Sequence, residues 1–179
     1  MTGHSLRTLF VWLIVPGLTI SCSSPPPPEH VRGPADVAGD AAKIDADSAT
    51  YTRTETSLPG LTAHGGTLTL LRADSQIVRA VAQFYSELGK RSDKFYLKDG
   101  RPFLLVRLAE LYDGRMSGNV IAQQRDSFYY SSTDLIHIGH AASGPVQIAA
   151  TPRLSLDSAR TELAELLRVA ATSGVSLQR

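Results

Sequence analysis

The stretch between residues 93 and 112 constrains the fold most, because its pattern predicts a β-hairpin. Apolar and polar side chains alternate over residues 93–98, which is the period of a strand with one buried face. The dipeptide Asp99-Gly100 follows, and this pair favours a two-residue hairpin turn because both positions tolerate positive φ. Arg101–Tyr112 then returns, and its apolar run Phe103-Leu104-Leu105-Val106 is typical of a central strand covered on both faces. We therefore predict antiparallel pairing around this turn.

Other short segments with strand character lie on both sides of this hairpin. Threonines alternate with aromatic and charged residues over 50–56, which predicts an edge strand. Residues 67–73 predict the next strand. Segments 127–132 and 135–140 predict a second hairpin around Thr133-Asp134.

Two segments predict connections instead of long strands. Residues 115–126 are polar and contain Gly118-Asn119, so we expect a loop there. Residues 141–153 contain glycine and two prolines, so we expect mainly a connection, with a short strand at 146–149.

Residues 76–88 fit two structures. Their apolar residues could form one face of a helix that ends at Gly89. The tight turn expected at Asp74-Ser75, and the β-branched and aromatic residues that follow it, instead indicate a returning strand. We predict a strand over 76–88.

One helix is predicted near the C-terminus, over Leu156–Thr172. Ser155 or Asp157 can cap it, and Ser173-Gly174 can end it. An apolar stripe repeats at helical spacing and would cover one face of a sheet: Leu156, Ala159, Leu163, Leu166, Leu167 and Ala170. The predicted fold is therefore α+β, an antiparallel β-meander sheet with one C-terminal helix packed on it, as a single domain over residues 49–179.

The N-terminus has the order of a secretory signal. Arg7 precedes an unbroken apolar run over residues 9–15, and small residues lead to Cys22. The run is too short for a membrane-spanning helix. We expect residues 1–21 to be a signal peptide.

The site before Cys22 resembles the lipobox of bacterial lipoproteins, although Thr19 stands where leucine is usual. The resemblance implies cleavage before Cys22, diacylglycerol on its sulfur and attachment to a membrane. Cys22 is the only cysteine in the chain, so no intramolecular disulfide can explain it. In envelopes with two membranes, Ser23 after the cysteine implies the periplasmic face of the outer membrane.

The composition of the mature chain predicts a tether and limits the kinds of partner. Residues 22–48 are rich in proline and alanine and lack aromatic residues, which predicts a disordered tether. Loss of Arg7 leaves 17 basic residues (18 − 1) against 17 acidic residues in the mature chain. This balance argues against a nucleic-acid partner.

Candidate catalytic and metal-binding residues are few. His137 and His140 would lie on opposite faces of a strand, so we expect no shared metal. His64 is interpreted as a turn residue. No nucleophile-elbow or phosphate-loop motif appears, and we expect neither cofactor nor catalysis.

Three Phe-Tyr pairs suggest a binding face. If each phenylalanine enters the core, Tyr85, Tyr96 and Tyr129 lie together on the other face of the sheet. Such a face suits a peptide, glycan or protein ligand, although cross-strand aromatic packing would explain the same pattern.

The segments Glu87-Leu88-Gly89-Lys90, Phe95-Tyr96 and Asp99-Gly100 make the domain similar to meander domains of uncharacterised bacterial lipoproteins. That resemblance implies no activity. We expect a lipid-anchored envelope protein that binds or scaffolds a ligand. The alternatives are a small envelope hydrolase and an inhibitor of an extracellular enzyme.

Overall fold

The computed structural model describes residues 32–149 and 151–173, so the predicted signal peptide and Cys22 lie outside the described residues. The elements follow in the order α1 (Pro34–Ala46), η1 (Asp47–Thr50), β1 (Thr52–Ser57), β2 (Gly66–Ala73), β3 (Gln76–Ser86), β4 (Gly89–Lys98), β5 (Arg101–Tyr112), β6 (Val120–Tyr130), β7 (Leu135–Ser143) and α2 (Leu156–Thr172). None of the helices in these ranges combines the length and apolar character that a membrane crossing requires.

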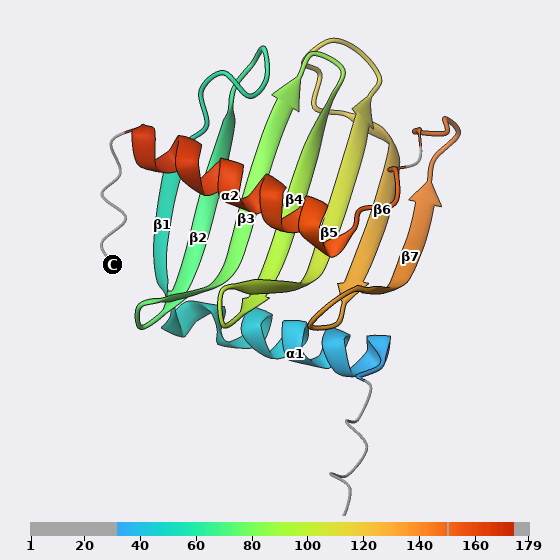
Figure 1. The fold of residues 1–179 in the computed structure, drawn as a ribbon. Helices are drawn as coiled ribbons and strands as arrows, with labels where there is room; N and C mark the ends of the chain where they lie inside the picture. The colour runs from blue at the N-terminus through green and yellow to red at the C-terminus, as the bar shows by residue number, and fades with distance from the viewer. Residues whose placement is uncertain (1–31, 150, 174–179) are drawn as a thin grey trace, which may run out of the picture. The chain divides into compact units, whose positions relative to one another are not determined.

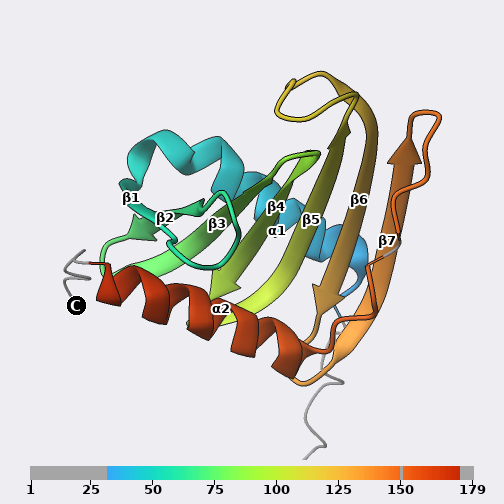
Figure 2. The same cartoon turned by 90° about the horizontal axis from the view of Figure 1, so that it is seen from above.

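The strands form one seven-stranded sheet in which every strand pairs antiparallel with its neighbour in the chain. Helix α2 crosses one face of this sheet, and α1 lies on the opposite face (Figures 1 and 2). The predicted α+β meander with a packed C-terminal helix is therefore confirmed.

The hairpin turns have the expected backbone. Asp99 and Gly100 have φ of 52° and 72°, which is the left-handed conformation that a tight turn between β4 and β5 requires. Asp74 also has a positive φ, and β3 begins two residues later, at Gln76. The prediction of a strand over 76–88 is confirmed over Gln76–Ser86.

Several strand boundaries differ from the predictions, and β4 begins at Gly89, four residues before the predicted start at 93. The loop expected over 115–126 is wrong from Val120 onward, where β6 begins, and β7 continues to Ser143. The short strand expected at 146–149 does not form. The first half of β6 looked like a loop because it carries polar residues on both faces. Gln124 and Asp126 are nevertheless buried. The hydrogen bond of 2.9 Å between their side chains replaces bonds to water that burial removes.

The larger core lies between the sheet and α2. Phe84, Phe95 and Phe128 enter it from three strands. Ser155 caps the helix by accepting a hydrogen bond from the Ser158 backbone N–H at 3.1 Å. The predicted helix is confirmed; Val169 is also buried, and Leu167 packs against the core but is only partly buried.

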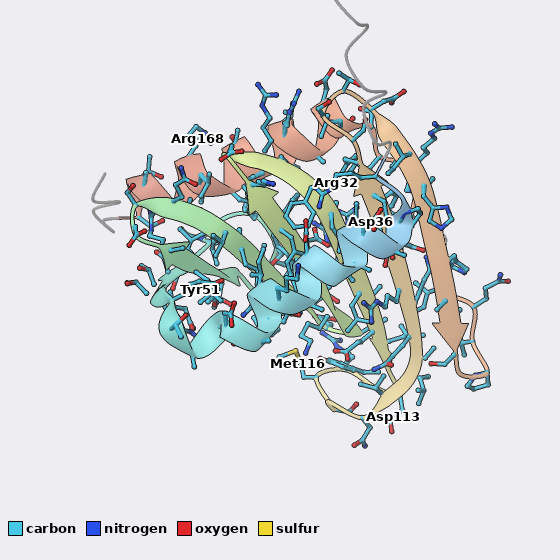
Figure 3. The ribbon with its side chains drawn as sticks, turned by 90° about the horizontal axis from the view of Figure 1, so that it is seen from below. Arg32, Asp36, Tyr51, Asp113, Met116 and Arg168 are labelled. Atoms are coloured by element: carbon cyan, nitrogen blue, oxygen red, sulfur yellow. The ribbon has the colours of Figure 1, made fainter. Side chains whose placement is uncertain are left out.

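Within residues 32–48, the described part of the predicted tether over 22–48, the prediction of disorder is wrong, because residues 34–46 form helix α1. Pro34 opens the helix, and the Asp36 carboxylate accepts a hydrogen bond from the Gly33 N–H at 3.0 Å. Val37 and Ala41 of this helix are buried. Figure 3 shows α1 crossing the face of the sheet opposite α2.

The surface that α1 covers forms a second, smaller core. Tyr96, Phe103 and Leu104 contact Val37 and Ala41. The register between β4 and β5 shifts at this point, which turns both Phe103 and Leu104 toward α1. A composition argument could not find this helix, because its apolar residues gain stability only from contact with a distant sheet.

Candidate binding groove

The alternation of the strands separates the Phe-Tyr pairs as expected, but the tyrosines do not form one patch. Tyr96 has an exposed fraction of only 4%, because α1 covers it, so its ring does not contribute an open surface to the predicted binding face. Tyr129 is half-buried and lies beside His137, with 5.4 Å between the ring centroids. Tyr85 lines a separate cavity. Tyr96 and Tyr129 therefore belong to the same apolar cluster beneath α1, whereas Tyr85 lies apart from them.

A groove of about 560 Å³ nevertheless lies on this face of the sheet, next to α1. We call it the tyrosine-face groove. The end of α1 and strands β4, β5, β6 and β7 contribute to it. Its walls and floor include Asp45, Lys94, Tyr96, Val106, Leu108 and Arg125.

Asp45, at the end of α1, contacts three polar side chains at the edge of the groove. Its carboxylate accepts a hydrogen bond from the Tyr96 hydroxyl at 2.7 Å and another from Arg79, and Lys94 lies 3.7 Å away. Burial opposes the charged form of Asp45, but the hydrogen bonds from Tyr96 and Arg79 outweigh it, and the pKa is lowered. Burial, together with the hydrogen bond to Asp45, raises the pKa of the Tyr96 phenol. The charge of Asp45 is therefore paired with two cations, Arg79 and Lys94.

Arg125 also lines the groove. It lies on β6, opposite Leu108 of β5 and Ala141 of β7, and its side chain is exposed. The salt bridges within residues 32–149 and 151–173 involve the neighbouring Lys90, Lys94 and His140, but not Arg125. Its guanidinium can therefore donate several hydrogen bonds to an anionic or polar ligand.

Uncharged polar groups surround this cation. Gln123 and Ser92 line the groove beside Arg125. The Gln123 amide donates to Glu110 at 3.1 Å, which positions its side chain. Val106 and Leu108 provide an apolar floor. A cation, hydrogen-bonding groups and an apolar floor are the usual components of a pocket that binds a ligand with both polar and apolar parts.

A buried ionic cluster lies on the opposite face, beneath α2. Arg107 donates to both oxygens of Asp93, at 2.7 and 2.9 Å, and to Glu162 of α2 at 2.7 Å. Burial opposes the charge on Arg107, but its bonds to Asp93 raise the pKa of the guanidinium. Burial also raises the pKa of Glu162, and Arg107 only partly offsets this. This cluster ties α2 to β4 and β5.

A histidine–carboxylate pair joins β6 to β7. His140 Nδ1 lies 2.6 Å from Asp126, whose second oxygen accepts a hydrogen bond from Gln124 at 2.9 Å. Burial opposes the charge on Asp126, but hydrogen bonds from Thr151, Gln124 and His140 lower its pKa. Sequence reasoning missed this pair, because the partners are far apart in the chain and pair only through the β6–β7 register.

The other histidines occupy separate positions. His137 pairs with Tyr129 across the strands, and His140 pairs with Asp126, which puts their side chains on opposite faces. His64 lies in the turn before β2, as predicted. Over the part of the chain that the structure describes, no three histidine, cysteine or acidic side chains gather as a metal site would require.

Comparison of the chain with protein-family models, with curated proteins and with solved structures gave no match.

Proposed function

We propose that this chain is a lipid-anchored protein of the cell envelope that binds a ligand in the tyrosine-face groove. The observation that carries the binding proposal is Arg125, a cation without a carboxylate partner among the described residues, which lines a groove of about 560 Å³. The sequence around Cys22 supports the anchor, and Ser23 supports the periplasmic face of the outer membrane in a host with two membranes. The class of ligand that fits is a molecule with an anionic or strongly polar group.

Replacing Cys22 with serine should release the protein from the membrane, because no sulfur remains to carry diacylglycerol. Fractionation should move the variant to the soluble envelope fraction, and labelling with a radioactive fatty acid should be lost. Ser21→Ala retains a small residue before the cut and is the matched control. Acyl labelling that survives in Cys22→Ser would refute the anchor, and wild-type protein in the inner membrane would refute the outer-membrane placement.

Replacing Arg125 with alanine should weaken ligand capture about 30-fold or more, because binding hot spots with buried arginine contacts commonly contribute 2 kcal/mol or more. The measurement is affinity capture from envelope extract with the detergent-extracted full chain, followed by titration of the captured ligand. The unfolding midpoint in urea should not change, because the side chain is exposed.

Arg101→Ala is the control for Arg125. Arg101 is also exposed and lies on β5, but it does not line the groove. If the two variants capture the ligand equally well, Arg125 does not contact the ligand and the proposal that the groove binds it is refuted.

One observation favours a second candidate, the small envelope hydrolase. Buried Asp126 holds His140 through Nδ1, and the His140 side chain has an exposed fraction of 52%. An imidazole oriented in this way can act as a general base through Nε2. His140→Ala should then abolish hydrolysis of p-nitrophenyl acetate, while His137→Ala should retain it. No hydrolysis above the rate of free imidazole would reject this candidate.

A further inference from the structure

A second cavity, of about 490 Å³, opens between α2 and the turn that joins β3 to β4. We call it the hairpin cleft. It shares no lining residue with the tyrosine-face groove. Its apolar surface comes from Leu61, Phe84, Leu88, Leu111 and Leu166. Its volume falls within the range of roughly 300–1,000 Å³ that small-molecule pockets have.

The apolar residues extend from the core to the surface. Leu166 of α2 and Phe84 of β3 are buried at the base of the cleft. Leu88, in the turn before β4, has an exposed fraction of 52%. Met116 is also exposed, and its backbone N–H donates to the Glu87 carbonyl at 2.6 Å, which ties its loop to the same turn (Figure 3). Two exposed apolar residues therefore lie on segments joined by a hydrogen bond, and Leu88 is the one that lines the cavity.

The charges around the hairpin cleft are satisfied within the protein. Glu110 pairs with Lys90 at 3.0 Å. The Glu162 carboxylate forms salt bridges with the guanidinium of Arg107, at 2.7 Å, and with that of Arg91, at 3.5 Å.

Glu165 and the second contact of Arg91 complete this set of charged groups. Glu165 pairs with Arg168 at 2.6 Å, and the Arg91 guanidinium lies 4.4 Å from the centre of the Phe84 ring. An ionic ligand would have to break one of these pairs, whereas an uncharged ligand would gain only from apolar contact.

From this arrangement we infer that the hairpin cleft binds an uncharged, mainly apolar small molecule. The base of the cleft receives an alkyl chain or an aromatic ring, and Leu88 closes over the part that reaches the mouth. This site is separate from the proposed ligand of the tyrosine-face groove, so either can exist without the other.

The test uses the domain from Arg32 to Arg179, because this segment forms a compact unit that contains the sheet and both cores. Without the lipid anchor no detergent is needed, which keeps micelles from competing for apolar probes. The probe is the neutral dye N-phenyl-1-naphthylamine, whose fluorescence rises in an apolar site. We expect saturable binding with one dye per protein.

Leu88→Glu should weaken dye binding about tenfold or more, because it replaces apolar contact with a charge. Its unfolding midpoint should stay the same, because Leu88 is exposed. The matched control is Ile138→Glu, on β7, where the isoleucine has an exposed fraction of 40% but does not line the cleft. Arg125→Ala should also leave dye binding unchanged, which separates this site from the groove.

Displacement of the dye defines the ligand class. At pH 8, 1-dodecanol should displace it at several-fold lower concentration than laurate, since the two share a chain and differ in charge. If indole displaces the dye better than dodecanol does, the bottom of the hairpin cleft binds an aromatic ring instead of an alkyl chain. Non-saturable fluorescence, equal loss in Leu88→Glu and Ile138→Glu, or stronger displacement by laurate would each overturn the inference.

Discussion

Replacing Arg107 with alanine should lower the free energy of unfolding by about 3–5 kcal/mol, the usual result of removing one partner of a buried ion pair. The Asp93 side chain is 0% exposed and receives two hydrogen bonds from Arg107. Without Arg107 this carboxylate stays buried and loses its main cation. Arg91, 3.1 Å from Asp93, remains as a second cation, so the lower half of the range is expected.

Urea unfolding followed by circular dichroism measures this effect. The control is Arg53→Ala on β1, because Arg53 also pairs with a carboxylate, Glu55 at 2.9 Å, but both side chains are mostly exposed. That variant should lose less than about 1 kcal/mol. Similar losses in the two variants would mean that the Arg107 cluster does not contribute to holding α2 on the sheet.

Replacing Leu163 with alanine should lower the free energy of unfolding by about 2–5 kcal/mol, the range measured for buried leucines. Leu163 lies in the middle of the buried stripe of α2 and is 5% exposed. Truncation would remove apolar contact with the sheet and leave a cavity between two rigid elements. The loss should lie toward the upper end of the range if neither element moves to fill the space.

The control for Leu163 is Glu165→Ala, on the outer side of the same helix. Among the residues that the structure describes, Glu165 bonds only to Arg168 of its own helix, and both side chains are largely exposed. Its replacement should leave the urea midpoint unchanged within error. Equal shifts for Leu163→Ala and Glu165→Ala would show that α2 does not dock on the sheet by this stripe.

Predictions from local pattern succeeded where the stabilising contacts are also local. The Asp99-Gly100 turn needs only two residues that tolerate positive φ, and α2 needs a cap at Ser155 and an apolar stripe. Strand alternation likewise separated Phe95 from Tyr96. These features determine a meander with a C-terminal helix, because each hairpin connects neighbours in the chain.

The sites depend on contacts between distant residues, and the sequence carries no local sign of them. Tyr96 is buried only because α1 docks on it, and the α1 segment looked like a coil in isolation. Arg107 and Glu162 meet only after α2 has crossed the sheet.

The sequence by itself therefore determined the strand order, the turns and the helix α2, and it gave the basis for the proposed anchor at Cys22. The tertiary structure decided which tyrosine is covered, where the two cavities lie and how His140 meets Asp126. The physical reason is that turns and amphipathic periods are set by neighbouring residues, whereas cavities and buried charge pairs arise only when separate elements pack together.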